Sequence, residues 1–505
     1  MTWHGRDQLI EFETVVRDNK NLRWRISCPS QEFADAEMRH GVGRWHSCVR
    51  GLWESLSLAR EDDLALIMIQ APPVPDPVLA YLFSLAPSGT HALAPERRHA
   101  MISIADTRDV HLSQKIMDQP DLLSQLRSLV ERLRAAGNPP EGLSCYASSP
   151  QMTRLCEELN LPLLETASRL TALGGKAQAR QIFRDLGVPH PVGTYSADRD
   201  SRDLAGSFRR LREKHASQHW LIKIDSGFGS GHGIARLGTD SSATVPVPDL
   251  NPAAVRPFTP SVSGSEFLRH VADRGAVIEM FVGPPEGDAP ANPSVLGYIG
   301  ADGAQVLGTH DQIIGDTLSF AGCRFPAAEE YRPAILEYAV AVFDELARRG
   351  ARGHVGVDFL AFRDSDGEHE WRVFALEINL RQTGTTHPNR TARALVSGEW
   401  TEAGELLADD GSQRYYWASD DLGSPTFSGI SPTTLIEELQ ARPELHYDAT
   451  RGVGVVPHLW TTLAPFGKIG ATVIAESHER CGELLGELVA LLERLSLEIL
   501  GRQSG

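Results

Sequence analysis

Apolar positions follow two different patterns in the first third of the chain. Residues 64–69 form a short uninterrupted apolar run that ends before Pro72 and Pro73, which is typical of a buried parallel strand. Residues 120–136 instead show the amphipathic pattern of a helix. Because strands alternate with helices here, the pattern predicts a parallel α/β domain over residues 1–165.

A helix followed by strands is predicted for the middle of the chain. Residues 176–186 form a helical stretch that ends at Gly187, with Pro189 and Pro191 beyond it. Residues 257–265 are rich in Ser and Pro and are expected to be a mobile connection. Strands are predicted at residues 220–224, 277–282, 295–299, 354–362 and 371–379.

The remainder of the chain predicts a hairpin and a final helix. The hairpin joins residues 453–463 to residues 471–475, and the helix runs from about residue 477 to residue 495. A chain of 505 residues exceeds one core, since domains usually have about 100 to 200 residues. We therefore expect three parts: residues 1–165, an intermediate region at 166–395, and a C-terminal segment at 396–505.

Composition excludes several classes of protein. A net charge of −17 disfavours nucleic acid and anionic membrane surfaces as partners, although a local cationic site for ATP remains compatible with it. No apolar stretch approaches the roughly 18 residues of a membrane span, and the N-terminus does not resemble an export signal. Six cysteines lie far apart without a CxxC pair. We expect a cytoplasmic protein with reduced thiols.

Two predicted strands carry acids that point to a metal. The Asp366-Gly367 pair between them is a typical two-residue hairpin turn. Pairing across this turn would place Asp358 opposite Ala375, with Glu377 diagonal to Asp358 and Asn379 on the same face. Phe374, Leu376 and Ile378 would then face the core. Three oxygen ligands suit Mg²⁺ held together with phosphate oxygens. The alternative is a solvated polar face without metal, and a one-residue bulge would disturb the convergence.

A glycine-rich loop follows the predicted strand at residues 220–224. Lys223 lies on that strand, and Gly227, Gly229, Gly231 and Gly233 follow it, so backbone N–H groups can approach phosphate oxygens. The spacing fits neither a P-loop nor a dinucleotide-binding fingerprint. A flexible loop beside an incidental lysine is the alternative.

Three further features suit a nucleotide, although each has a plain structural explanation. Lys176 lies near the start of a predicted helix, where free N–H groups favour anions. The apolar strand around Glu279 suits backbone contacts to adenine, and Glu286 beyond it suits ribose hydroxyls. A surface lysine and a buried strand with one acid are the alternatives.

In this order, these features resemble the nucleotide site of the ATP-grasp superfamily over residues 176–388. The resemblance implies that Lys176 and Lys223 contact phosphates and that Met280 and Val282 contact adenine through their backbone, with Glu279 beside them. It implies that Asp358, Glu377 and Asn379 bind magnesium. The loop expected to cover the phosphates comprises Gly227, Phe228, Gly229, Ser230, Gly231 and Gly233.

A narrower resemblance extends over nearly the whole chain. Residues 377–388, 175–176 with 187–191, 452–458 and 467–470 are similar to segments of the pheganomycin-type peptide ligases. The resemblance implies an α/β and α+β multidomain architecture: an N-terminal α/β pre-ATP-grasp domain, the ATP-grasp lobes and an extra C-terminal segment. It also implies a ligase that joins an amino-acid-like carboxylate to the amine of an amino acid or peptide in natural-product biosynthesis.

ATP-grasp ligases are known to act through an acyl phosphate, which requires a cationic site. Lys223 and Arg381 are the first candidates for catalytic groups, and Arg381 suits the reacting carboxylate because its planar fork binds two oxygens. Arg324 and His387 are weaker candidates for the same pocket. Other interpretations are a ligase with a different acceptor, a kinase, and a nucleotide-binding module without chemistry. The oligomeric state stays open, a homodimer included.

Overall fold

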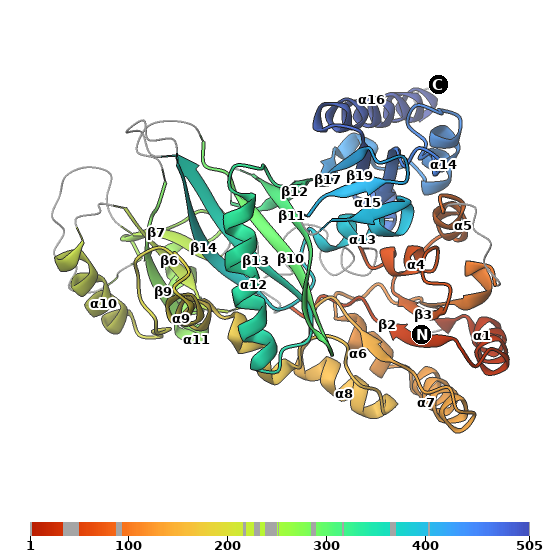
Figure 1. Cartoon of the computed structure of the whole chain (residues 1–505), viewed down its shortest axis with the longest axis horizontal. Coiled ribbons are helices and arrows are strands. Elements are labelled where there is room, and N and C mark those ends of the chain that lie inside the picture. Colours follow the sequence, from red (N-terminus) through yellow and green to blue (C-terminus); the bar gives the residue numbers. More distant parts are fainter. Residues whose placement is uncertain are drawn as a thin grey trace.

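Three β-sheets and the helices packed on them make up the described part of the fold. The computed structural model describes residues 3–33, 50–86, 93–215, 219–226, 233–237, 250, 252–283, 289–315, 318–363, 370–401 and 404–503. Figure 1 shows a small sheet at one end, a large sheet in the middle, and the N-terminal sheet with the C-terminal helices at the other end.

The N-terminal sheet has the order β1-β4-β3-β2-β5, and β2 to β5 run parallel. All residues of β3 are buried, which confirms the predicted buried parallel strand. Ile67 packs with α1, α6, α7 and α8, whereas Leu66 and Met68 pack with α4, α5 and the C-terminal helices on the other face. The strands are β1 (Trp3–His4), β2 (Arg23–Ser27), β3 (Leu64–Gln70), β4 (His99–Ile104) and β5 (Gly142–Ser144); the helices are α1 (Arg6–Asp18), α4 (Trp53–Ser57), α5 (Asp76–Ser84), η1 (Pro95–Arg98), α6 (Leu112–Met117), α7 (Pro120–Ala135) and α8 (Pro150–Leu159).

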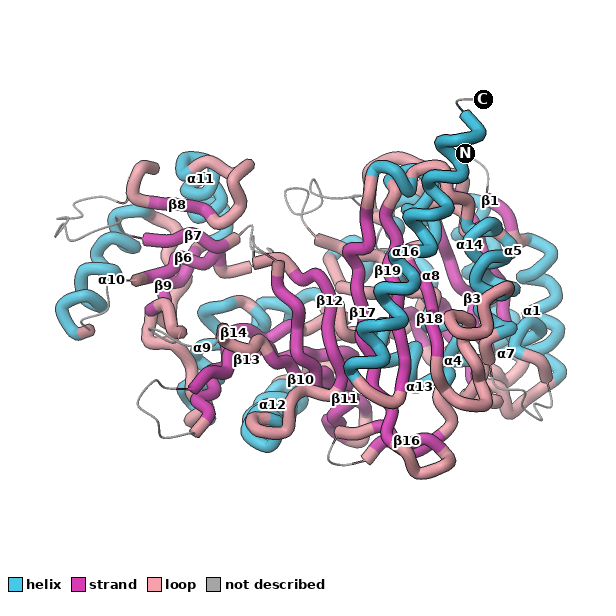
Figure 2. Tube along the Cα trace, turned by 90° about the horizontal axis from the view of Figure 1, so that it is seen from above, coloured by secondary structure: helices cyan, strands magenta, loops and turns pink. Residues whose placement is uncertain are grey.

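A short turn of helix, η2 (Ser168–Gly174), leads into α9 (Lys176–Leu186), and α9 ends where Gly187 adopts a φ of 70°. The predicted helix and its glycine stop are therefore confirmed. The small antiparallel sheet follows, in the order β8-β7-β6-β9, with α10 and α11 on it (Figure 2). Its elements are α10 (Ser201–Lys214), β6 (Trp220–Ile224), β7 (Ile234–Leu237), β8 (Val255–Pro257), α11 (Gly264–Arg274) and β9 (Ala276–Met280).

The predicted mobile connection at residues 257–265 is shorter than expected. Strand β8 takes in Pro257, and α11 begins at Gly264, where the Ser263 hydroxyl accepts a hydrogen bond from the backbone N–H of Glu266. One of the serines that suggested a mobile connection, Ser263, is therefore the N-cap of α11.

The large sheet joins the middle of the chain to its end. Its order is β14-β13-β10-β11-β12-β17-β16-β15, with β19 paired to β17 and β18 paired to β19. Apolar residues of α9 and α12 pack on one face, through Val295, Val357 and Ile378 among others. Its elements are β10 (Pro293–Gly300), β11 (Gly303–Ile314), β12 (Phe320–Phe325), α12 (Arg332–Arg348), β13 (Gly353–Arg363), β14 (Trp371–Asn379), α13 (Thr386–Leu395), β15 (Gly398–Trp400), β16 (Leu406–Ala408), β17 (Gln413–Gly423), η3 (Pro425–Phe427), α14 (Pro432–Gln440), β18 (Gly454–His458), α15 (Trp460–Phe466), β19 (Lys468–Ala475) and α16 (His478–Gln503).

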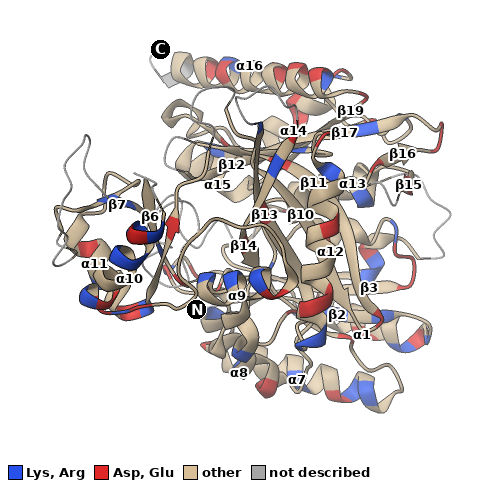
Figure 3. Ribbon diagram, turned by 60° about the vertical axis from the view of Figure 1, so that its left-hand side comes forward, with Lys and Arg blue, Asp and Glu red and all other residues tan. Residues whose placement is uncertain are grey.

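The C-terminal hairpin is present but differs from the prediction. Strands β18 and β19 pair antiparallel, yet Trp460–Phe466 forms helix α15 instead of extending the first strand. Leu459 takes a φ of 61° at this change of direction. The last helix, α16, is longer than predicted, and charged residues of both signs lie along it and along α12 (Figure 3). Among the described residues, no helix is long and apolar enough to cross a membrane.

Candidate active site

The predicted metal residues come together at the edge of the large sheet, although in a different register. Asp358 on β13 lies directly opposite Glu377 on β14, and Asn379 Nδ2 donates to Asp358 Oδ2 at 2.8 Å. From β11, Gln312 Nε2 donates to the other Asp358 oxygen at 2.9 Å. Two carboxylates and an amide therefore converge on one face of the sheet.

The predicted pairing of Asp358 with Ala375 is wrong because the register shifts between Asp358 and Phe359. Ala375 pairs with Phe359, and both are buried. The bulge also changes which residues of β14 enter the core: Val373, Ala375 and Ile378 are buried, whereas Phe374 and Leu376 are only partly so. The predicted turn at Asp366-Gly367 lies outside the described residues.

The electrostatics of this cluster suit a cation. Desolvation and the nearby Glu377 carboxylate together raise the pKa of Asp358 to about 6, against the opposing effects of Arg381, Gln312 and Asn379. Two carboxylates facing each other repel unless a positive charge lies between them. Because the donor set consists of carboxylate and amide oxygens, the residues fit Mg²⁺.

Lys176 supplies a positive charge beside these acids. Its Nζ lies 3.4 Å from Glu377 Oε1, and the side chain is buried at the first residue of α9. The N–H groups expected to be free at this helix start are not free: the Lys176 N–H donates to the Asp225 carbonyl and the Ala177 N–H to its carboxylate, at 2.9 and 2.7 Å. The side chain of Lys176, and not the start of its helix, therefore faces the acids.

Lys223 belongs to a buried ionic triad in the small sheet. Its Nζ lies 2.6 Å from Glu279 Oε2, and Arg180 Nη1 lies 3.0 Å from Glu279 Oε1. Burial opposes ionisation of Glu279, but the charges of Lys223 and Arg180 outweigh it and lower the pKa of Glu279. Glu279 is therefore the counter-ion that fixes Lys223. The sequence missed Arg180, which lies one helical turn after Lys176.

The other predicted nucleotide contacts are only partly within the described residues. Gly227, Phe228, Gly229, Ser230, Gly231 and Glu286 lie outside the described residues. Gly233 closes the predicted loop, because its carbonyl accepts from the Ile224 N–H at 2.8 Å. Met280 ends β9, and its N–H already donates to the Val192 carbonyl at 2.7 Å, so that group is not available to adenine. Val282 lies just beyond the strand and is half-buried.

Arg381 lies where the large sheet meets the N-terminal part. Its guanidinium stands over the Phe33 ring, 5.0 Å from the centroid, and Nη1 donates to the Gln382 carbonyl at 3.0 Å. Its charge also acts on Asp358, so it lies near the acid cluster. The contact of Phe33 with Arg381 could not be predicted from the sequence, because it joins two distant segments of the chain.

Arg324 is not in this pocket, which corrects the prediction. It pairs with Asp311, whose carboxylate accepts from the Tyr331 hydroxyl and from the Ala328 N–H, both just before α12. Successive residues of a strand face opposite sides, and Gln312, next to Asp311, faces Asp358. Arg324 therefore lies on the other face of the sheet, where it is exposed and stacks on Trp417.

His387 belongs to a separate buried cluster. Its Nε2 lies 3.0 Å from Asp420 Oδ1 and 3.2 Å from His458 Nε2, and His458 Nε2 lies 2.7 Å from the same Asp420 oxygen. Arg50 pairs with the other Asp420 oxygen at 2.5 Å, which balances the carboxylate. Burial lowers the pKa of His387 to about 4 against the opposing effect of Asp420. Arg50 and Asp420 were missed by the sequence, whereas His458 ends one of the segments that carry the narrower resemblance.

The chain is similar in sequence or in fold to several known proteins. A family model described as PGM1 C-terminal domain matches residues 435–485. The L-propargylglycine–L-glutamate ligase of Streptantibioticus cattleyicolor is 29% identical over 393 residues, which are 77% of each chain. A biotin carboxylase from Campylobacter jejuni, solved as a beta-gamma-ATP complex, superposes with a TM-score of 0.53 at 11% identity, over 91% of this chain and 89% of that one.

A third relative was solved with nucleotide and metal. The biotin carboxylase domain of the Hydrogenobacter thermophilus 2-oxoglutarate carboxylase, in complex with MgADP, ADP and bicarbonate, has a TM-score of 0.51 at 12% identity, over 90% of this chain and 86% of that one. The chain therefore has the ATP-grasp fold, as the sequence predicted. Within that class, the matched family model and the curated ligase agree with the narrower resemblance to the pheganomycin-type peptide ligases.

Proposed function

We propose that this chain is an ATP-dependent ligase that joins the carboxylate of an amino acid or amino-acid-like acid to the amine of an amino acid or peptide. The observation that carries the proposal is the cluster of Asp358, Glu377 and Asn379 beside Lys176, set in an ATP-grasp fold. The ligase from Streptantibioticus cattleyicolor, whose name describes two joined amino acids, supports the substrate class. A role in natural-product biosynthesis follows from the narrower resemblance and is part of the same proposal.

The cationic side chains would let two anions meet. A carboxylate approaching the γ-phosphate of ATP meets a repulsion of roughly 4 kcal/mol per pair of unit charges at 4 Å and an effective dielectric of 20. Lys176 and Lys223 would offset this repulsion, and Glu279 keeps Lys223 in place. Asp358, Glu377 and Asn379 would hold Mg²⁺, which when bound would supply further positive charge beside the phosphates.

The reaction then has two steps. An oxygen of the carboxylate attacks the γ-phosphorus, and the bond to the ADP oxygen breaks. The amine nitrogen attacks the acyl carbon of the acyl phosphate, the C–N bond forms, phosphate leaves, and the amine proton passes to solvent. Arg381 suits the reacting carboxylate and the oxyanion of the second step, because it stands near Asp358 and carries a two-donor fork.

Product formation in pairs of candidate substrates tests the proposal. The purified protein would be incubated with Mg²⁺-ATP and pairs of amino acids or short peptides, glutamate among them. ADP and phosphate release would be measured, while mass spectrometry looks for the sum of two substrates minus water. Amide formed in equal amount with ADP and phosphate supports the ligase. A stable phosphorylated acid without amide would indicate a kinase, and nucleotide binding without turnover across the panel would indicate a module without chemistry.

A further inference from the structure

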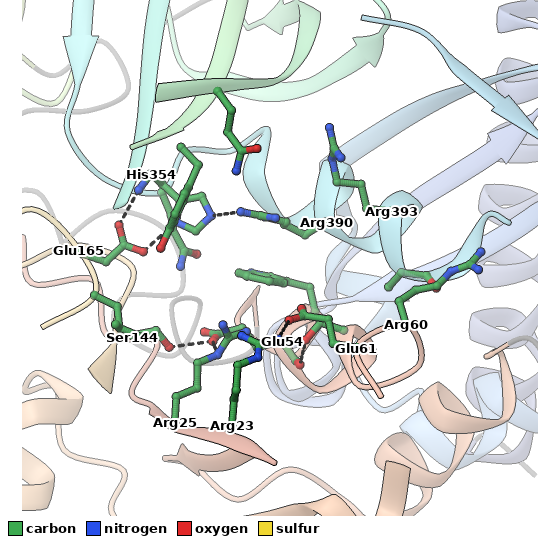
Figure 4. Close-up of a pocket in the computed structure, with 17 residues that line it drawn as sticks. Arg23, Arg25, Glu54, Arg60, Glu61, Ser144, Glu165, His354, Arg390 and Arg393 are labelled. Carbon is green, nitrogen blue, oxygen red and sulfur yellow. Dashed lines mark hydrogen bonds and ion pairs between the residues drawn. The ribbon is translucent and has the colours of Figure 1, made fainter. Parts of the chain in front are cut away.

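A cavity of about 440 Å³ lies on the same face of the large sheet as Asp358, further along it. Tyr298 and His354 line it, and they pair four residues along the strands from the Ser294–Asp358 pair. The other walls come from β2 and α4 of the N-terminal part and from α13. Figure 4 shows Arg390 directed toward His354, and Arg25 beside Glu54.

Most of the acids in this cavity are already engaged. Glu165 accepts from the backbone N–H of His354 at 2.8 Å and from its ring at 2.7 Å. Glu54 is fully buried and accepts from the hydroxyls of Ser27 and Ser144, both at 2.7 Å. Glu61, the third acid, lies 3.2 Å from Arg23 at the surface.

Several arginines of the cavity, in contrast, lack a carboxylate partner. Arg390 Nη2 contacts His354 Nε2 at 3.1 Å, and its Nε is buried without a hydrogen bond. Arg393 donates to the Leu307 carbonyl at 2.6 Å and to Asn389 Oδ1 at 3.1 Å. Neither arginine forms an ion pair with a carboxylate among the described residues.

Burial and the neighbouring arginines both disfavour the charged forms of Arg390 and Arg393. Burial lowers the pKa of Arg390, and the adjacent Arg25 lowers it further, while Glu61 and Glu165 only partly compensate. Burial also lowers the pKa of Arg393 to about 10, with Arg390 acting in the same direction. A buried cation without a counter-charge is unfavourable, so an anion that entered would be stabilised there.

We propose that this cavity is a second ligand site, which takes a small organic anion carrying two or more carboxylate or phosphate groups. Its volume is in the range of about 300 to 1,000 Å³ usual for small-molecule pockets. Arg390 and Arg393 lie one turn apart on α13, and guanidinium groups bind carboxylate and phosphate through paired N–H donors. More than one arginine faces the cavity, so a ligand with two anionic groups fits better than one with a single group.

The site borders the candidate active site without being part of it. Gln382 directly follows Arg381 and lines the cavity, and it is tied to the N-terminal part by hydrogen bonds to the carbonyls of Tyr146 and Cys145. A bound anion would therefore contact the N-terminal sheet, the large sheet and α13 together. The proposal goes beyond the ligase function and does not rest on it.

Calorimetric titration of the full chain with citrate and with inorganic phosphate, at constant ionic strength, tests the proposal. Gln305 lines the cavity and is exposed, so its variants should fold normally. We expect saturable binding that Gln305→Glu weakens and Gln305→Arg strengthens, each by roughly threefold to tenfold. Arg390→Gln should weaken binding by about tenfold or more, because a hydrogen bond to a charged group is lost. The surface control Arg17→Gln, on α1, should have no effect.

The outcomes separate the two sites. Binding of citrate alone identifies a carboxylate ligand, and binding of both probes identifies the shared anionic chemistry. Lack of saturable binding would overturn the proposal. The proposal would also be overturned if Gln305→Glu and Gln305→Arg left binding unchanged while Lys176→Met abolished it. The anion would then lie in the nucleotide site. If Arg390→Gln does not fold, the opposite effects of the two Gln305 variants still show whether the anion binds in this cavity. ADP release measured in the same variants without citrate reports on the ligase proposal separately.

Discussion

Lys176 and Glu377 meet at the point where α9 approaches the edge of the large sheet, with Nζ 3.4 Å from Oε1. The lysine begins a helix and the glutamate lies near the end of β14, so the contact joins two of the segments from which the nucleotide site was predicted. The same glutamate faces Asp358 across the sheet. One carboxylate therefore connects the candidate phosphate-binding lysine to the candidate metal cluster.

We predict that Glu377→Gln reduces ligase turnover by a factor on the order of 100 or more, because a charged group that acts on the transferred phosphoryl is lost. The loss should persist at saturating ATP and be partly relieved by raising the Mg²⁺ concentration. ADP release against Mg²⁺ concentration measures both effects. Glu370→Gln, an exposed acid just before the same strand, is the matched control. Wild-type turnover in Glu377→Gln would remove this residue from the metal cluster.

The buried triad of Lys223, Glu279 and Arg180 makes a prediction about stability. Glu279→Gln leaves two buried cations without their counter-charge, which should destabilise the chain by about 3 to 5 kcal/mol. Urea unfolding followed by tryptophan fluorescence measures the change. The double variant Glu279→Gln with Lys223→Met should lose less than the single variant, since one of the two unpaired charges is gone. Equal loss in both variants would show that Lys223 does not depend on Glu279.

Much of the fold near the site follows from local signals. Helix α9 has the predicted bounds because its glycine stop acts within a single turn, and β14 matches because its apolar pattern is continuous. The convergence of Asp358 and Asn379 also followed from the two strands. The pairing of Asp358 did not, because the alternation of apolar and polar residues does not show the bulge beside Phe359, a residue that packs in one core with α9 and α12.

Residues that meet only through the tertiary fold were beyond prediction. Arg324 could be assigned to a face only after its pairing with Asp311 was known, since a strand pattern does not say which neighbour it has. The anion cavity combines side chains of residues as distant as Arg23 and Arg393. The same reasoning applies to α15, which was predicted as part of a strand. Its apolar residues suit a strand or a helix, and their packing in the C-terminal core selects the helix.

The two arginines predicted for one pocket should behave differently. Arg381→Gln is expected to lower kcat/KM by about two orders of magnitude, because Arg381 stands beside the acid cluster and would hold developing negative charge. Arg324→Gln should change kcat/KM by less than about twofold, since its side chain is exposed on the other face of the sheet over Trp417. Steady-state assays of both variants measure the contrast. Similar losses in the two variants would contradict the assignment of faces.

Acid should destabilise the N-terminal part through His99. The side chain is buried, its Nε2 lies 3.0 Å from the Ser55 hydroxyl, and burial lowers its pKa from the ordinary 6.5 to about 3. Between these two values the unfolded chain binds a proton that the folded chain does not bind. The stability contributed by neutral His99 is therefore complete above about pH 6.5 and is lost as the pH falls toward 3, at up to about 1.4 kcal/mol per pH unit. Melting temperatures of the wild type and His99→Gln, measured from pH 7.5 to pH 4.5, should show a shallower decline in the variant, because it cannot take up this proton. Parallel declines would mean that His99 does not contribute to the acid sensitivity.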